Sequence, residues 1–233
     1  MSSIENKKLF SKELAYIAGM LILAFGTAFM EAADYGVSMV VAPAYIIHLK
    51  VSEFASFFTF GMAEYTLQAV LIAITAAVLR RFRLSYLLSF VTAVIYGFML
   101  DGAMAIIALM PCTHVAVRLL FFAIGMLCCS LGVALLFHTY IPPEAYELLV
   151  KEVSAKFNIN ISRFKTCYDC ISCAISILLS FAFFGFGVFE GVKLGTVICA
   201  LLNGSIIAVI TTFMEKHFVF RASFPSAEAR LSK

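Results

Sequence analysis

Six long apolar stretches with almost no charge constrain the fold of this chain more than any other feature. They cover residues 14–30, 54–79, 84–110, 119–137, 170–189 and 194–214. A helix needs about 20 residues to cross a bilayer, and each stretch approaches or exceeds that length once flanking polar side chains reach the interface. In 233 residues that are 63% hydrophobic and only 13% charged, so much apolar surface cannot be buried in a soluble domain. The sequence therefore predicts an all-α membrane protein with about six transmembrane helices.

Two segments between these stretches are too short or too polar to be assigned as spans. They are Asp34–Lys50 and Tyr140–Lys165, and each follows the first long stretch of its half of the chain. Both are candidates for re-entrant backbone, which survives at membrane depth only where protein or a water-filled cavity satisfies its polar groups. The residues that mark these candidates are Tyr35, Ser38, Pro43, Pro142 and Pro143. A surface-lying amphipathic helix is the alternative, and the four charges between Glu144 and Glu152 make it equally good for the second segment.

The positions of Lys and Arg decide the predicted topology, because cytoplasmic loops of membrane proteins collect these residues. If neither short segment crosses, 14 of the 17 basic residues fall on the side of both termini, and only Lys50, Arg118 and Lys193 fall on the other. This bias predicts a multi-pass protein of a bacterial cytoplasmic (inner) membrane, with both termini in the cytoplasm. The predicted membrane domain comprises a cytoplasmic N-terminus (1–12), two halves (13–111 and 112–217) and a cytoplasmic tail (218–233).

The two halves resemble each other at an offset near 106 residues. The matching residues are Gly19 with Gly125, Gly26 with Gly132, Glu64 with Asp169, Tyr96-Gly97 with Asn203-Gly204 and, once a short gap is allowed, Tyr45 with Tyr146. Because each half has three spans, an odd number, the second half must insert upside down relative to the first. Inverted repeats with short segments in corresponding positions are typical of secondary transporters, whose site lies near the membrane midplane between the halves. The sequence therefore predicts two inverted three-helix repeats.

Polar residues inside the predicted spans are the candidates for solute binding or proton coupling: Glu64, Gln68, Asp101, Asp169 and Asn203. An ionisable side chain at the bilayer centre costs about 2.5–3.5 kcal/mol or more, so it needs a partner, a proton or water. With its helix starting at Phe54, Glu64 lies near mid-depth, and Gln68 follows on the same face. Asp101 is expected at a similar depth, where two carboxylates in one dry cavity suit proton coupling.

Structural roles remain open for three of these candidates. Asp101-Gly102 is a plausible turn near the membrane surface, which would leave the carboxylate in solvent. Asp169 lies close to basic residues in the sequence and is explained equally well as a paired or snorkelling side chain. Asn203 joins helices by hydrogen bonding in the alternative explanation, rather than binding a solute.

Four stretches of the first half share a pattern of small residues: 19–26, 35–38, 60–64 and 85–97. Together they resemble the YczE/YitT-like family of bacterial membrane proteins, and the second half of the chain matches more loosely. The resemblance implies a bundle of six helices of largely undefined function, often supposed to be transport. It brings no established active-site motif to these positions.

These features predict a permease or secondary transporter of a small solute, with proton coupling through Glu64 and Asp101 as one option. The alternative is a substrate-binding or accessory membrane subunit of a larger transport complex, because such a subunit would show the same hydrophobic helices and no nucleotide-binding motif. The expected partners are the lipid bilayer and a small-molecule solute, with further copies of the chain left open. Dispersed basic residues argue against nucleic acid.

An enzyme is not expected from this sequence. The chain has no HExxH zinc motif and no aspartyl-protease signature in its membrane segments, so no catalytic residue is predicted. Cys167, Cys170 and Cys173 recur at every third position and would fan across one helix face, where they cannot converge on a metal. The sequence therefore predicts neither a metal site nor a cofactor.

Overall fold

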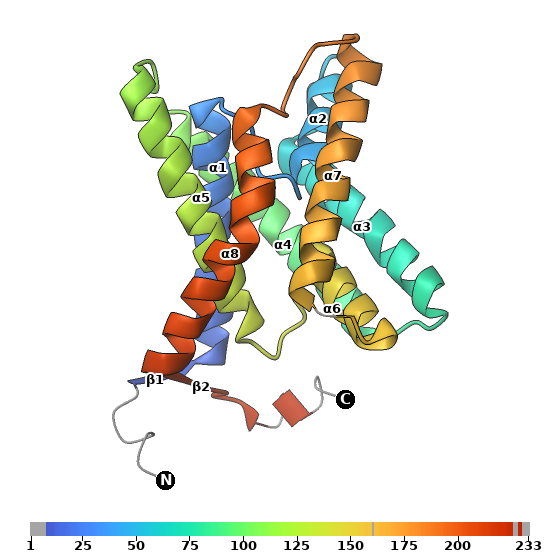
Figure 1. The fold of residues 1–233 in the computed structure, drawn as a ribbon, viewed down its shortest axis with the longest axis vertical. Helices are drawn as coiled ribbons and strands as arrows, with labels where there is room; N and C mark the ends of the chain where they lie inside the picture. The colour runs from blue at the N-terminus through green and yellow to red at the C-terminus, as the bar shows by residue number, and fades with distance from the viewer. Residues whose placement is uncertain (1–7, 160, 226–227, 230–233) are drawn as a thin grey trace.

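The computed structural model describes residues 8–159, 161–225 and 228–229, and in these residues the chain forms eight α-helices and two short β-strands (Figure 1). Six helices are long and apolar enough to cross a membrane: α1 (Lys12–Ala33), α3 (Phe60–Leu79), α4 (Leu84–Ile107), α5 (Val115–Phe137), α7 (Ile161–Phe184) and α8 (Leu194–His217). Two are short: α2 (Ala42–Ser52) and α6 (Ala145–Phe157). The predicted all-α membrane fold is confirmed, and the chain is a multi-pass membrane protein.

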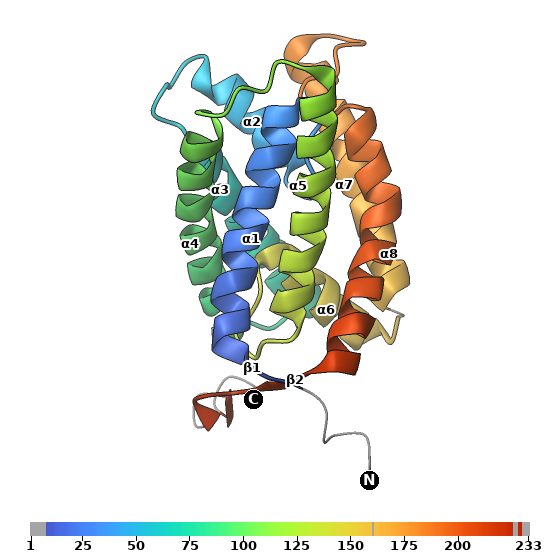
Figure 2. The ribbon, with the colours of Figure 1, turned by 90° about the vertical axis from the view of Figure 1, so that its left-hand side faces the viewer.

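The two strands pair the N-terminal and C-terminal parts of the chain with each other, a feature that the sequence did not reveal. β1 (Lys8–Ser11) pairs in parallel with β2 (Phe218–Arg221). Both strands lie at the same end of the bundle, which we call the terminal end, and the opposite end is the far end (Figure 2). The predicted N-terminal segment and tail thus each contribute one strand, while residues 1–7 and 230–233 lie outside the described part of the chain.

The start predicted for the second span is wrong. The sequence predicts a helix from Phe54, but the chain forms turns there and α3 begins only at Phe60. Thr59 marks the start, because its side chain accepts a hydrogen bond from the backbone N–H of Met62. Apolar residues before this cap extend the hydrophobic stretch without extending the helix.

The limits predicted for the fifth span, 170–189, are also wrong. α7 begins at Ile161 and ends at Phe184. It ends where it does because Gly185 and Gly187 take positive φ values, 104° and 87°, which a helix does not tolerate. The predicted segment Tyr140–Lys165 therefore contains the whole of α6 and the first turn of α7.

Glycines bring α1 and α5 into close contact along their length. A Cβ atom at Gly19 would lie 3.0 Å from the backbone oxygen of Gly132, and one at Gly26 would lie 2.9 Å from that of Gly125. The offset of 106 residues carries Gly19 onto Gly125 and Gly26 onto Gly132, so it exchanges these two contacts. An inverted repeat requires this two-fold relation, and the α1–α5 pair lies on the approximate axis.

The two short segments dip into the protein from opposite ends. α2 lies in the far half of the bundle and α6 in the terminal half (Figure 1). Every residue is buried from Gly36 to Ala44, and again from Pro142 to Val150. A helix lying flat on a membrane surface would bury only one face. Burial on all sides means that the start of each short helix is inserted among the long helices, so the re-entrant interpretation describes both segments better than the surface one.

Each half of the protein holds the short segment of the other half through hydroxyl groups. On α8, Thr196 Oγ1 donates to the backbone oxygen of Val37 at 2.8 Å. On α4, Ser89 Oγ donates to the backbone oxygen of Pro143 at 2.6 Å. Carbonyl groups of irregular backbone have no water to bind at this depth, so these hydroxyls stabilise the re-entrant conformation. The interlocked halves leave a space where the two short segments meet.

Candidate functional site

A cavity of about 40 Å³ lies between the two short segments, and we call it the central cavity. The short segments contribute Ser38, Val40, Val41, Glu144, Tyr146 and Glu147 to its wall. Polar side chains from α1, α4, α5, α7 and α8 add Thr27, Tyr96, Cys129, Lys165 and Asn203. Both inverted halves therefore line one space near the middle of the bundle, where transporters built from inverted repeats place their site.

One amide bridges two glutamates beside the central cavity. Gln68 Nε2, on α3, donates to Glu64 Oε1 at 3.4 Å and to Glu144 Oε2 at 3.2 Å. Gln68 Oε1 accepts from the backbone N–H of Ala145 at 2.9 Å, which orients the amide and ties α3 to the start of α6. Glu64 and Gln68 are fully buried and Glu144 is 4% exposed. The bridge thus joins two carboxyl groups that are shielded from solvent by protein.

One lysine pairs with two further carboxylates at the same site. Lys165 Nζ, on α7, lies 2.8 Å from Glu147 Oε1 and 3.2 Å from Asp169 Oδ1. All three side chains are at most 8% exposed. Removing one partner from such a buried group leaves an uncompensated charge and is strongly destabilising. The three side chains form a buried ion triad with one negative charge in excess when all are ionised.

Four buried oxygen atoms at this site have no hydrogen-bond partner in the described part of the chain: Glu64 Oε2, Glu144 Oε1, Glu147 Oε2 and the Tyr146 hydroxyl. An unpaired buried polar group costs about 1–3 kcal/mol, so these atoms require a ligand, a proton or water. Glu144 lies outside the six long helices. Burial, together with the charges of Glu64 and Glu147, raises the pKa of Glu144 well above its usual value.

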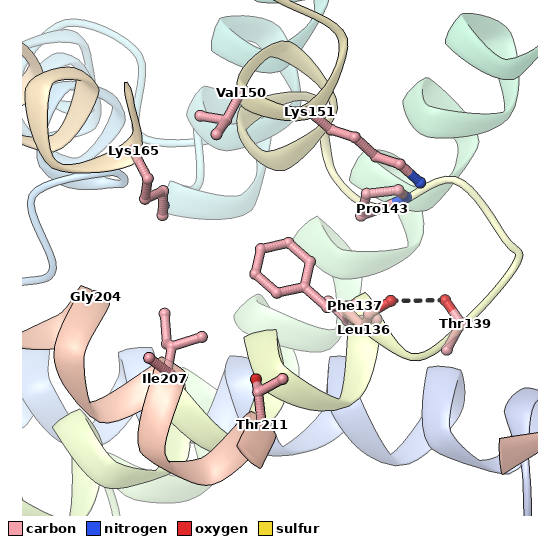
Figure 3. A pocket seen from close by; sticks show the side chains of 11 residues that line it. Leu136, Phe137, Thr139, Pro143, Val150, Lys151, Lys165, Gly204, Ile207 and Thr211 are labelled. Atoms are coloured by element: carbon pink, nitrogen blue, oxygen red, sulfur yellow. Dashed lines mark hydrogen bonds between the residues drawn. The ribbon is translucent and has the colours of Figure 1, made fainter. Parts of the chain in front are cut away.

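A wider cavity of about 330 Å³ lies in the terminal half, and we call it the vestibule (Figure 3). α6 and α7 form one side of it, and α8 with the end of α5 forms the other. Leu136 and Lys165 line both the vestibule and the central cavity, so the two spaces are neighbours. The exposed residue Lys151 also lines the vestibule, which therefore reaches the protein surface.

The far end is closed by contacts between the linker that precedes α2 and the turn that precedes α8. Val37 N–H donates to the backbone oxygen of Gly191 at 3.3 Å, and Gly195 N–H donates to that of Tyr35 at 2.9 Å. The Cβ of any larger residue at Gly195 would lie 2.5 Å from the ring of Phe122, so the start of α8 packs closely against α5. We call these contacts the far-end seal.

Comparison with known proteins identifies the family. Residues 10–212 match a family of unknown function, DUF6198. The chain belongs to this family. The matched range includes every residue that lines the central cavity of this DUF6198 protein. No curated protein and no solved structure matches the chain.

Four of the five predicted site residues lie at the central cavity or beside it. Glu64 and Gln68 form the carboxyl–amide bridge, and Asp169 belongs to the ion triad. Asn203 lines the cavity and also accepts a hydrogen bond from Ser130 Oγ at 2.7 Å, so it joins α8 to α5 as well. Glu64 is only four residues, or about 6 Å, from the start of α3. It is buried because the start of α6 packs against α3 there.

Asp101 has a different environment from the other predicted residues. Its carboxylate accepts from the backbone N–H of Gly61 at 2.9 Å and from Thr59 Oγ1 at 2.7 Å, so it caps the start of α3. The alternative of a turn at Asp101-Gly102 is wrong, because α4 continues through these residues to Ile107. The carboxyl group that shares a hydrogen-bonding amide with Glu64 is that of Glu144.

Sequence reasoning missed Glu144, Glu147 and Lys165 as site residues because their segment resembles an amphipathic surface helix. The available signal was Pro142-Pro143, immediately before Glu144, which predicts a helix starting at that point. In a re-entrant segment a helix starts at membrane depth. A carboxylate in its first turn would then be placed in the interior.

The residues chosen as markers of re-entrant backbone lie where the segments turn inward. Ser38 lines the central cavity, and Pro43 lies in the first turn of α2. The backbone oxygen of Tyr35 belongs to the far-end seal. Pro142 and Pro143 accept the hydroxyl hydrogen bonds from α4.

Proposed function

We propose that this protein is a secondary transporter that moves a small solute through the central cavity between its inverted halves. The observation that carries the proposal is an enclosed cavity where both short segments meet, with a vestibule on one side and the far-end seal on the other. A carrier exposes its central site to one side of the membrane at a time, whereas a channel needs a continuous path. The arrangement supports a carrier whose site faces the terminal end.

The asymmetry between the two ends supports alternating access. Leu136, Lys165 and Ile207 line the vestibule. Their repeat-related residues, at offsets of 106, 105 and 107, are Met30, Phe60 and Leu100. These three are buried in the hydrophobic core, and the far-end pocket that Met30 lines has a volume of only about 20 Å³, against about 330 Å³ for the vestibule. A rocking motion that opens this far space and closes the vestibule would exchange the two ends, as in other inverted-repeat carriers.

Labelling of Cys129 tests two-sided access directly, because this native cysteine lines the central cavity. The other six cysteines are replaced by alanine or serine, and sealed vesicles of known orientation are treated with Ag⁺, a thiol-reactive ion that is small enough for the cavity. Cys129 that has not reacted is then counted by alkylation after unfolding. We expect labelling from the terminal-end side and, more slowly, from the far side. A second protein that retains only Cys112, in the far-end turn before α5, marks the far side.

A variant of the far-end seal adds a matched control to this experiment. Thr196→Val removes the hydroxyl that binds the backbone oxygen of Val37 and should raise the far-side labelling rate of Cys129. Thr212→Val removes a hydroxyl that binds only within its own helix, α8, and should leave the rate unchanged. Labelling of Cys129 from the terminal-end side alone, in wild type and in both variants, would contradict a carrier.

A substrate-binding or accessory subunit of a larger transport complex is the alternative, because an enclosed site open to one end suits a protein that hands its solute to a partner. Co-purification from native membranes distinguishes the two. Stoichiometric recovery of an ATPase, together with loss of solute uptake when that partner is removed, would favour the accessory role. A carrier moves its solute in vesicles that contain this chain alone.

The proposal also covers the membrane in which the protein lies, its orientation there and its resemblance to other membrane proteins. We place the protein in a bacterial cytoplasmic membrane with the terminal end in the cytoplasm, because 14 of its 17 Lys and Arg residues are predicted on that side. The resemblance to the YczE/YitT-like proteins agrees with this placement. We assign no catalytic activity, and we propose that the bilayer and the solute are the main partners, with self-association left open.

A further inference from the structure

The charges around the central cavity do not balance. Among the described residues, no ion pair joins Glu64 or Glu144 to a basic side chain, and the two share only the amide of Gln68. Lys165 is already engaged by the two carboxylates of the ion triad. Four carboxyl groups against one lysine leave an excess of three negative charges if all are ionised. A buried site cannot hold such an excess without protons or a bound cation.

Three of the unpartnered atoms belong to residues that line the cavity and are almost completely buried: Glu144, Tyr146 and Glu147, the last of which is already paired with Lys165 through its other oxygen. Glu144 is 4% exposed and Tyr146 is 3% exposed. Among the described residues, Glu144 Oε1 has no hydrogen-bond partner, and the Tyr146 hydroxyl faces the carboxyl group of Glu64 without a hydrogen bond within 3.5 Å. A carboxylate oxygen accepts hydrogen bonds, and a phenol oxygen accepts as well as donates. The cavity therefore offers acceptors to a ligand that brings N–H or O–H donors.

The size of the cavity limits the ligand to a few heavy atoms. A volume of about 40 Å³ has room for roughly three water-sized groups, since each needs about 10–15 Å³. Among the described residues, no three His, Cys, Asp or Glu side chains converge as they would around a metal ion. An anion is disfavoured as well, because Glu144 and Glu147 already place negative charge at the positive, N-terminal end of α6.

We propose that the solute of the central cavity is a small protonated amine, of the size of ammonium or methylammonium. Its N–H groups bind the free oxygens of Glu144 and Tyr146, and its charge offsets the carboxyl pair that Gln68 bridges. The inference rests on the proposed function, since it names the chemical class of the transported solute. Lys165 stays in the ion triad and helps to exclude a second cation by repulsion.

A proton competes with the amine at this site. The titratable groups that line the cavity are Tyr96 on α4, Cys129 on α5, Glu144 at the cap of α6, Tyr146 and Glu147 on α6, and Lys165 on α7. Next to these groups lie Glu64 on α3, Tyr168 and Asp169 on α7, and Cys199 on α8. α1 and the linker before α2 add the neutral hydroxyls of Thr27 and Ser38. An alkylammonium stays charged at neutral and acidic pH, as the lysine side chain does. Its affinity should therefore fall about tenfold for each pH unit below the pKa of Glu144, because protonation removes the acceptor charge.

Thermal unfolding of the full chain in detergent tests the proposal with defined probes. Methylammonium chloride is compared with potassium chloride and sodium phosphate at equal ionic strength, at pH 8 and pH 6. We expect methylammonium alone to raise the apparent Tm, by roughly 5–10 °C at a hundredfold excess over its Kd, and the rise to be smaller at pH 6. Glu144→Gln should abolish the rise and Tyr146→Phe should weaken it. Glu152→Gln, on the outer part of the same helix, should retain it.

Each alternative outcome overturns the inference in a recognisable way. An equal response to potassium would assign the site to a metal cation, and a response to phosphate would assign it to an anion. A methylammonium response that survives both Glu144→Gln and Tyr146→Phe would place the ligand elsewhere. If methylammonium binds but Cys129 is labelled from one side only, the ligand class stands and the transport proposal fails. If Cys129 is labelled from both sides but methylammonium does not raise Tm, the transport proposal stands and the ligand class fails.

Discussion

Replacement of Lys165 by methionine tests whether the buried ion triad holds α7 against α6. The substitution keeps the apolar stem of the side chain but removes the charge that lies 2.8 Å from Glu147 Oε1 and 3.2 Å from Asp169 Oδ1. Both carboxylates are less than 8% exposed, so water cannot replace the lysine. Breaking a buried ion pair in this way costs about 3–5 kcal/mol. For a chain of this size about 1 kcal/mol shifts Tm by roughly 2–4 °C, so Lys165→Met should lower Tm by roughly 6–20 °C.

The assay is the apparent Tm of the purified protein in detergent at one fixed scan rate, followed with a thiol-reactive dye that reports exposure of buried cysteines. Lys151→Met is the matched control, because Lys151 also lines the vestibule but is exposed. It should change Tm little, as surface substitutions usually do. The triple variant Lys165→Met, Glu147→Gln, Asp169→Asn removes all three charges and should recover at least half of the lost Tm. Equal Tm values for Lys165→Met and Lys151→Met, or no recovery in the triple variant, would refute the reasoning.

Four further substitutions probe the scaffold around the site. Gly26→Ala should destabilise the protein by about 1–3 kcal/mol, because the new Cβ would lie 2.8 Å from the backbone nitrogen of Cys129 on α5. Gly102→Ala is the matched control: a Cβ there meets nothing within 4 Å, so it should be neutral or stabilising by about 0.5–1 kcal/mol. Equal Tm shifts for the two variants would contradict this explanation. Asp101→Ala should cost about 0.5–2 kcal/mol through the lost cap and should speed hydrogen exchange at the start of α3, while amine binding stays unchanged. Glu13→Ala should release the backbone N–H of Ser223, which lies 3.0 Å from the Glu13 carboxylate, and should therefore speed proteolysis after β2. An unchanged rate of proteolysis would show that this contact does not hold the segment in place.

Much of the architecture could be predicted from local patterns in the sequence. Apolar length alone gives the six long helices, because a helix that crosses a bilayer must be apolar over about 20 residues wherever it sits in the fold. The glycine pairs at an offset of 106 residues predict the inverted repeat, and their observed contacts between α1 and α5 agree with it. The limits of α3 and α7 were less predictable, since caps and glycines rather than hydropathy end a helix.

The candidate site was only partly predictable, because burial of a polar side chain depends on which distant segment covers it. Glu64 and Gln68 were found from their place in an apolar stretch. Glu144 was missed, since nothing local distinguishes a carboxylate in an inserted helix from one on a surface helix. Asp101 lies in an apolar stretch as well, yet the structure uses it as a cap for α3.

The sequence by itself thus determined that this protein lies in a membrane, how many long helices it has and that its halves are inverted. These are properties of hydropathy, length and spacing, which act residue by residue along the chain. Only the tertiary structure decided that α6 inserts its first turn against Gln68, that Lys165 pairs with two carboxylates, and that the ends of the chain form a parallel pair of strands. The physical reason is that a buried polar group is satisfied by partners far away in sequence, and packing chooses those partners.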